Sequence, residues 1–208
     1  MPLILLNSIK SDTKVALWKL TENETELTQL LLSKSPRQLE QIPVTNNRKL
    51  YLQRMAIRLL ILHFFDDVTL TYNEKGKPIL SNGMEVSFSH SNEMVAMAIN
   101  PHQQCGIDIE KIASKVLRIK AKFLNPVELA LVEKEEHPEK LATIFWSCKE
   151  ALYKFYSEKE VLFDQHLAIQ YHPKFSNLLI GTININGFHQ QLNLHQQIID
   201  DYVLVFTT

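Results

Sequence analysis

The sequence predicts an α+β fold, because its strand-like and helix-like segments occur in groups and do not alternate one by one. A strong helical pattern runs from Asn46 to Phe65, with apolar residues recurring every three or four positions. By contrast, the end of the chain contains strand-like runs, two of them joined by the hairpin turn Asn186-Gly187. With 208 residues, of which 45% are hydrophobic, the chain can form one large domain or two small packed ones.

The first half is expected to begin with two strands, a helix and a loop bracketed by Pro36 and Pro43. The long helix and four short strands follow, with turn sequences at Asn73–Pro78 and Asn82-Gly83. The predicted elements are, in order, strands Leu3–Leu6 and Val15–Leu20, helices Glu24–Ser33 and Asn46–Phe65, and strands Val68–Tyr72, Ile79–Leu80, Val86–Ser89 and Met94–Ile99.

The second half is expected to open with a strand, continue with two helices and close with four strands. Asn125-Pro126 reads as a helix cap followed by a proline in the first helical position, and Pro138 starts the second helix. The predicted elements are strand Cys105–Glu110, helices Val127–Glu136 and Pro138–Tyr156, and strands His166–Tyr171, Leu178–Ile185, Phe188–Leu194 and Tyr202–Phe206. No long linker divides the halves, so we place a boundary near Asn100–Gln104, which gives residues 1–102 and 103–208.

Two short segments carry the chemistry that the sequence indicates. In Gly106-Ile107-Asp108-Ile109-Glu110, two carboxylates alternate with isoleucines. Residues two apart on a strand point to the same face, so these carboxylates are expected to project together. In Trp146–Lys154, which reads as a helix, Glu150 and Lys154 lie one turn apart on one face. Carboxylate oxygens suit Mg²⁺, which typically also takes waters and a substrate phosphate.

These residues resemble the motifs of the phosphopantetheinyl transferase superfamily, in which a G-x-D-x-E strand precedes a W-x-x-K-E-A-x-x-K helix. Both motifs are complete here, in the same order and about forty positions apart, and weaker likenesses extend over most of the chain. The resemblance is to the two-half, surfactin-synthetase-activating type of this family. It implies a pseudo-duplicated monomer whose similar α/β halves pack with the active site between them, the first for coenzyme A and the second for metal and catalysis.

The resemblance implies that Asp108, Glu110 and Glu150 bind Mg²⁺ at the diphosphate of coenzyme A. Glu150 is alternatively the acceptor of the proton from the attacking hydroxyl, directly or through water. Lys154 is implied to reach a phosphate oxygen, although its spacing also allows a helical salt bridge with Glu150. Lys149 points about 100° away around the helix, and the sequence leaves its role open.

Other residues match parts of the family that contact coenzyme A. Ser89 and His90 correspond to an S-H-S segment at the diphosphate, where an imidazole and hydroxyl groups can donate hydrogen bonds to an anion. The histidine is also counted among the implied catalytic groups. Lys77 stands in a G-K-P turn and corresponds to a lysine that binds a coenzyme A phosphate.

The long helix of the first half carries a basic face formed by Arg48, Lys49, Arg54 and Arg58. In the family, arginines of the corresponding helix help to hold the nucleotide. Arginine suits this role because its guanidinium meets phosphate oxygens bidentately. We favour Arg48 and Arg54, and the other two remain alternatives.

A second basic feature lies between Glu110 and Glu128, where five cations occur without an acid: Lys111, Lys115, Arg118, Lys120 and Lys122. A solvated helix face would explain this run. Beside a phosphate-transfer site it would instead steer an acidic protein partner. Carrier proteins, the partners that the resemblance implies, are small acidic helical domains. We therefore expect an apo acyl or peptidyl carrier protein to dock near Lys111–Glu128.

The resemblance thus implies a transferase that moves 4′-phosphopantetheine from coenzyme A, its substrate, to a carrier-protein serine. The reaction depends on Mg²⁺ and releases adenosine 3′,5′-bisphosphate. One alternative is a catalytically silent regulator that binds coenzyme A or a carrier protein, but the intact carboxylates and Lys154 count against it. Another is a different Mg²⁺-dependent phosphate-transfer enzyme that acts on a nucleotide and turns over without a protein substrate.

Composition excludes several other classes of protein. A net charge of −1 argues against a protein built mainly to bind nucleic acid. Cys105 and Cys148 are too few for a disulfide framework or a cysteine zinc site. The first residues lack the basic and apolar regions of a signal peptide, and no segment reaches the roughly twenty apolar residues that span a membrane. We therefore expect a cytoplasmic protein without a membrane partner.

Overall fold

The computed structural model describes residues 3–7, 12–171 and 177–208. The chain divides into two compact units, Met1–Gln103 and Gln104–Thr208. This boundary lies one residue after the one predicted from the sequence. Within the described ranges, none of the helices combines the length and the apolar character that crossing a membrane requires.

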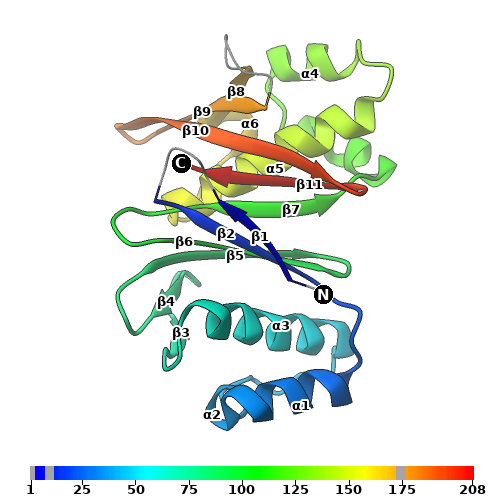
Figure 1. Cartoon of the computed structure of the whole chain (residues 1–208). Helices are drawn as coiled ribbons and strands as arrows, with labels where there is room; N and C mark the ends of the chain where they lie inside the picture. Colours follow the sequence, from blue (N-terminus) through cyan, green and yellow to red (C-terminus); the bar gives the residue numbers. More distant parts are fainter. Residues whose placement is uncertain (1–2, 8–11, 172–176) are drawn as a thin grey trace. The chain divides into compact units, whose positions relative to one another are not determined.

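The first unit is built on a four-stranded antiparallel sheet in the order β1-β2-β6-β5 (Figure 1). Its central strand β6 pairs with β2 on one side and β5 on the other, and all seven of its residues are buried. A separate hairpin of β3 and β4 precedes β5 in the chain. The strands are β1 Leu3–Asn7, β2 Lys14–Lys19, β3 Leu70–Tyr72, β4 Pro78–Leu80, β5 Glu85–Ser91 and β6 Met94–Asn100.

Three helices accompany this sheet: α1 Glu24–Lys34, α2 Pro36–Glu40 and α3 Arg48–Phe64. The apolar side of α3 packs against one face of the sheet and shares a hydrophobic core with β2, β5 and β6. The loop expected between Pro36 and Pro43 is a wrong prediction in part, because α2 starts at Pro36. Proline fits the first turn of a helix, where its missing N–H group has no intrahelical partner.

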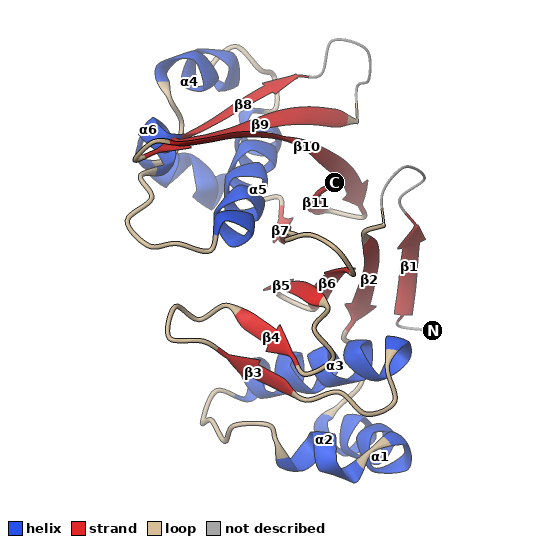
Figure 2. Ribbon diagram, turned by 90° about the vertical axis from the view of Figure 1, so that its left-hand side faces the viewer, coloured by secondary structure: helices blue, strands red, loops and turns tan. Residues whose placement is uncertain are grey.

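The second unit is built on a five-stranded antiparallel sheet in the order β7-β11-β10-β9-β8 (Figure 2). Asn186 and Gly187 form the predicted hairpin turn between β9 and β10, and both have positive φ angles. β10 continues beyond its predicted end because its last six residues pair with β11. The strands are β7 Ile107–Lys111, β8 Leu167–Tyr171, β9 Leu178–Ile185, β10 Phe188–Ile199 and β11 Tyr202–Thr207.

The helices of this unit are the 3₁₀ helix η1 Ser114–Lys122, and α4 Pro126–Val132, α5 Pro138–Tyr156 and α6 Phe163–His166. The long helix α5 packs on one face of the sheet and contributes the largest share of the core. α4 ends at Val132, four residues before its predicted end. Acidic side chains dominate those four residues, and negative charge is unfavourable at the carboxyl end of a helix.

The two units share one plan, which confirms the predicted α+β class. In each unit a strand is followed by helices, and a later strand pairs antiparallel with the strand that precedes those helices. β2 pairs with β6 in this way, and β7 pairs with β11. A long helix, α3 or α5, packs on the sheet in each case. The arrangement agrees with the pseudo-duplication expected from the family resemblance.

Candidate functional site

The predicted carboxylate pair lies on strand β7, on the face that helix α5 covers. Asp108 pairs with Val205 of β11, and Glu110 pairs with Val203. Both valines belong to the core that α5 forms with the sheet, and directly paired residues of adjacent strands point to the same face. Asp108 is buried and Glu110 is partly exposed, whereas the alternating isoleucines are buried on the opposite face. The two carboxylates therefore project together, as the sequence predicts.

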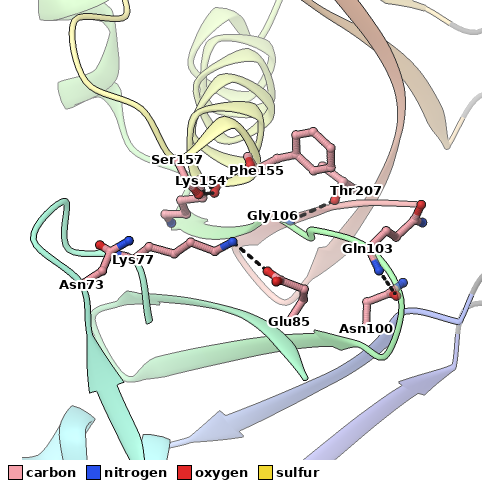
Figure 3. Close-up of polar contacts among 10 residues, drawn as sticks. All are labelled: Asn73, Lys77, Glu85, Asn100, Gln103, Gly106, Lys154, Phe155, Ser157 and Thr207. Atoms are coloured by element: carbon pink, nitrogen blue, oxygen red, sulfur yellow. Dashed lines mark hydrogen bonds and ion pairs between the residues drawn. The ribbon is translucent and has the colours of Figure 1, made fainter. Parts of the chain in front are cut away.

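Gly106 explains how closely β7 and α5 approach each other. A Cβ atom at this position would lie 1.9 Å from the carbonyl oxygen of Ala151 in α5, which is far inside van der Waals contact. The Gly106 amide donates to Thr207 Oγ1 at 2.9 Å, and the Thr207 amide donates back to the Gly106 carbonyl (Figure 3). The glycine of the strand motif thus lets the helix backbone lie directly on the start of the strand.

Lys154 connects the helix motif to the strand motif. Its Nζ atom donates to Asp108 Oδ1 at 2.8 Å and to the main-chain oxygen of Ile107 at 3.0 Å. The Lys154 side chain is 25% exposed, whereas that of Asp108 is 4% exposed. The ion pair that the sequence suggested, with Glu150 one turn earlier, is replaced by one with a carboxylate 46 residues away.

Glu150 shares this electrostatic environment. Burial is the main reason why the pKa of its carboxyl is raised from 4.5 to about 7. The negative charges of Asp108 and Glu110 add to the rise, while the ammonium of Lys154 opposes it. The three predicted metal ligands therefore lie close enough to repel one another, and a group with a pKa near neutrality can exchange a proton at physiological pH.

The donors around this point suit a hard cation. Asp108, Glu110 and Glu150 supply only carboxylate oxygens, which Mg²⁺ prefers, and their mutual repulsion is relieved by positive charge. Among the described residues, however, no three His, Cys, Asp or Glu side chains converge as ready-made metal ligands. The positive charge on Asp108 in this structure is the ammonium of Lys154. The residues fit Mg²⁺ by chemistry, and side chains would have to move to bind it.

Lys149 has a structural position that the sequence left open. It is fully buried, and its ammonium donates to Glu128 Oε2 at 2.6 Å and to the main-chain oxygens of Phe123 and Phe163 at 2.6 and 2.9 Å. These three acceptors use all three ammonium donors. Burial lowers the pKa of Lys149, and the attraction of Glu128 opposes that effect. The side chain therefore ties α5 to η1, α4 and the start of α6.

Glu128 completes this buried network. Its carboxylate accepts hydrogen bonds from the amide of Asn125, in the capping box of α4, and from the amide of Ile169 in β8. The sequence did contain a signal for the network. Lys149 stands four residues after Phe145 and three before Leu152, so it lies on the apolar stripe of α5. A lysine on such a stripe needs a buried acidic partner.

The coenzyme A residues predicted in the first unit are held by local partners. Lys77 Nζ pairs with Glu85 Oε2 at 2.7 Å, and Asn73 organises the turn around it (Figure 3). Arg54 donates to the Pro43 carbonyl at 3.0 Å, and the exposed Arg48 lies 3.8 Å from Glu24.

The two alternatives on the same helix differ in their surroundings. Arg58 is buried, and its guanidinium donates to Gln38 Oε1 and to the main-chain oxygen of Gln41, which fastens α2 to α3. Lys49 donates to Asn92 Oδ1 at 3.0 Å on the surface. Arg58 is therefore a structural residue, whereas the favoured Arg48 is exposed and the favoured Arg54 is partly exposed on α3.

Ser89 and His90 lie near the end of β5, an edge strand of its sheet. His90 pairs with Val95, a residue of the core under α3, whereas Ser89 pairs with Ala96. Neighbouring residues of a strand point to opposite faces, so these two side chains diverge. His90 is exposed and Ser89 is buried. A ligand at the edge of this sheet could contact both.

In the basic run between Glu110 and Glu128, fewer cations are exposed than the five that the sequence contains. Lys111 pairs with Asp201 at 2.9 Å, and Lys120 pairs with Glu133 at 2.8 Å. The cations that the structure leaves exposed along η1 are Lys115, Arg118 and Lys122. Val127 and Leu131 of α4, the helix that follows η1 in the chain, are exposed hydrophobic residues one turn apart. The η1–α4 segment therefore carries both exposed positive charges and exposed apolar side chains.

Comparison with known proteins places the second unit in a family. A family model described as "4′-phosphopantetheinyl transferase superfamily" matches residues 104–207, half of the chain, and includes both motifs of the β7–α5 site.

Three curated proteins are similar to parts of the chain. The 4′-phosphopantetheinyl transferase HetI of Nostoc sp. is 32% identical over 96 residues, which cover 42% of this chain and 40% of HetI. The 4′-phosphopantetheinyl transferase gsp of Aneurinibacillus migulanus is 30% identical over 91 residues, 43% of this chain and 38% of that protein. Enterobactin synthase component D of Salmonella typhi is 26% identical over 144 residues, 66% and 57% of the two chains. The matches to the first two proteins thus span about two fifths of their length.

Proposed function

This chain belongs to the 4′-phosphopantetheinyl transferase superfamily, and on that premise we propose that it transfers 4′-phosphopantetheine from coenzyme A to a serine of an apo carrier protein. The serine oxygen bonds to the phosphorus next to pantetheine, and the bond from that phosphorus to adenosine 3′,5′-bisphosphate breaks. The observation that carries this proposal is the β7–α5 surface, where three carboxylates and Lys154 form one electrostatic group.

We assign Asp108, Glu110 and Glu150 to a Mg²⁺ site at the diphosphate. When bound, Mg²⁺ would neutralise charge on the diphosphate and on the leaving group. The support is the oxygen-only donor set and the mutual repulsion of the three carboxylates. Glu150 is also the group best suited to accept the serine proton, directly or through water, because its pKa of about 7 is close to physiological pH.

The positively charged groups of the proposal stabilise phosphate oxygens. Lys154 is partly exposed beside the carboxylates, and its ammonium is assigned to the diphosphate together with His90. Ser89, Lys77, Arg48 and Arg54 of the first unit are assigned to binding of coenzyme A. Lys77 would exchange its present partner Glu85 for a phosphate, since both groups are partly exposed at that contact.

We assign the carrier protein to the surface of η1 and α4. Lys115, Arg118 and Lys122 would attract an acidic helical domain, and Val127 and Leu131 would add apolar contact. The expected monomeric state is part of the same proposal.

The decisive experiment is intact mass spectrometry of apo acyl and peptidyl carrier proteins incubated with this protein, coenzyme A and Mg²⁺. A gain of one phosphopantetheine, abolished by EDTA and by a serine-to-alanine carrier, is the expected result. Asp108→Ala should abolish the gain and retain the circular dichroism spectrum, whereas the exposed Asp67→Ala should remain active. No gain on any carrier, or full activity of Asp108→Ala, would refute the proposal.

The docking surface has its own test. Lys115→Glu with Lys122→Glu should raise the KM for the carrier protein about tenfold at low salt and reduce its dependence on ionic strength. The KM for coenzyme A should stay within about twofold. Lys159→Glu, a charge reversal at an exposed loop position, is the matched control and should leave both constants unchanged. An unaltered salt dependence in the double variant would remove this surface from the proposal.

A further inference from the structure

The contact between Lys154 and Asp108 places a protein cation on a carboxylate that the proposed function assigns to the metal. Lys154 Nζ lies 2.8 Å from Asp108 Oδ1, and the aspartate is almost completely buried. A buried carboxylate is stable only with a positive charge or hydrogen-bond donors nearby. In the metal-free protein the ammonium supplies that charge.

The ammonium is held in a way that permits release. Its second acceptor is the neutral main-chain oxygen of Ile107 at 3.0 Å, and its side chain is 25% exposed. Among the described residues, these two oxygens are its hydrogen-bond acceptors, so one of the three ammonium donors remains for solvent. The attraction to Asp108 is thus the main charged interaction that keeps Lys154 against β7.

A divalent ion at Asp108 would face this ammonium at short range. Like charges this close, screened by little water, repel strongly, so both cannot occupy the same side of one carboxylate. The ammonium has room to leave because it stands near the end of α5 and reaches solvent. Its long flexible stem can carry the charge to a new partner without movement of the helix.

We propose that Lys154 and Mg²⁺ exchange at Asp108, so that metal binding releases the lysine ammonium for the phosphate of coenzyme A. This inference rests on the proposed function, because it takes Asp108 as a metal ligand. Lys154 then has two successive partners: Asp108 in the metal-free protein and the diphosphate in the loaded one. By thermodynamic linkage, any anion that draws Lys154 away from Asp108 also tightens metal binding by the same factor.

Lys149, on the same helix, is a lysine that cannot exchange its partners. It is fully buried, and three acceptors in other elements use all of its donors. No ion could replace it without opening the core between α4 and α5. The exchange is therefore a specific consequence of the partial exposure of Lys154 and of its ion pair with one carboxylate, Asp108.

The test is calorimetric titration of the coenzyme A-free protein with MgCl₂. Lys154→Met should bind Mg²⁺ about five- to twentyfold more tightly than the parent chain, because the competing cation is gone. Lys154→Arg keeps a cation that can occupy Asp108 and should bind no more tightly than the parent. Lys111→Met removes a nearby positive charge that pairs with Asp201, and its affinity should change less than about twofold.

A second readout follows the ammonium itself. In ¹⁵N-labelled protein, the side-chain signal of Lys154 should be protected from solvent exchange without Mg²⁺ and lose that protection when Mg²⁺ is added. Unchanged or weaker Mg²⁺ affinity in Lys154→Met would overturn the exchange, and so would a protected signal in saturating Mg²⁺. These outcomes are separate from the proposed function, which stands or falls with phosphopantetheine transfer by the parent chain.

Discussion

Lys149 and Lys154 lie five residues apart on helix α5 and have different roles, one in the fold and one in the candidate site. The first is completely buried, with a charged partner and two main-chain acceptors in three other segments. The second is one quarter exposed, with one charged partner on β7. A lysine whose donors are all satisfied inside the protein contributes to the fold. A lysine with one replaceable partner at the surface is available for chemistry.

The two lysines also mark two parts of helix α5, one that supports the fold and one that carries the reactive groups. The buried network of Lys149 and Glu128 fixes α5 against η1, α4 and β8, the segments that carry the proposed carrier surface and its support. One position later, Glu150 begins the group of charges that faces β7. The same helix thus positions the docking segment and presents the reactive groups, and variants in and around it distinguish these two roles.

Lys149→Met should destabilise the protein most, because it leaves the carboxylate of Glu128 buried without its cation. Removing one partner of a buried ion pair typically costs about 3–5 kcal/mol. For a chain of this size that corresponds to a fall in Tm of roughly 6–20 °C. The double variant with Glu128→Gln should recover part of the loss, since the buried charge is gone. A loss below about 1 kcal/mol in Lys149→Met would contradict the structural task of this lysine.

Gly106→Ala should come next, with a loss of about 1–3 kcal/mol, because its Cβ would overlap the backbone of α5 at Ala151. Helix α5 and strand β7 must then separate, which moves the groups of the β7–α5 site apart. We therefore expect a large fall in transfer activity together with this moderate loss of stability. Gly181→Ala is the matched control. The atoms nearest to its Cβ would belong to the side chains of Leu194 and Leu152, which can rotate, so we expect a smaller loss of both stability and activity. Equal losses in the two variants would argue against the close approach as the function of Gly106.

Lys154→Met should lose about 1–2 kcal/mol in a chelating buffer, less than a fully buried pair because the lysine is partly exposed. The loss should shrink when MgCl₂ is present on the order of ten times above Kd, since the metal then stabilises Asp108. Transfer activity should remain at least about a hundredfold lower, as one charge that faces the transition state is missing. Thermal denaturation with and without Mg²⁺ measures this, and Lys149→Met should show no such rescue.

Glu150→Gln should have the smallest effect on stability, and its size should depend on pH. The folded-state pKa of about 7 lies above the ordinary value of 4.5, so the native state binds the proton more tightly than the unfolded state. The corresponding stability is present below pH 4.5 and is lost as the pH rises through 7. In a chelating buffer, glutamine should therefore stabilise the protein by roughly 1 kcal/mol at about pH 8 after screening. At about pH 4.5 the substitution should have almost no effect on stability. Thermal denaturation measures the difference in stability between the variant and the parent chain. The same difference at both pH values would contradict burial as the cause of the raised pKa.

Local patterns were enough to predict most of the elements. Asn125-Pro126 opens α4, Pro138 opens α5 and Asn186-Gly187 turns β9 into β10, because caps, prolines and turn residues act over a few positions. The errors have local causes as well. Pro36 starts a short helix where a loop was expected, and the acidic residues after Val132 end α4 early.

The motif residues themselves could also be read from the sequence, including the shared face of the carboxylates on β7 and the helical spacing of Glu150 and Lys154. The partners of these residues could not be read from the sequence. Lys154 pairs with Asp108 across 46 residues, and Lys149 pairs with Glu128 across a loop and a helix boundary. Such pairs exist only when separate elements pack, and burial then decides which charge is held and which can leave. The sequence alone determined which groups this protein carries, and packing decided that one lysine supports the fold while the other stands where a cation can replace it.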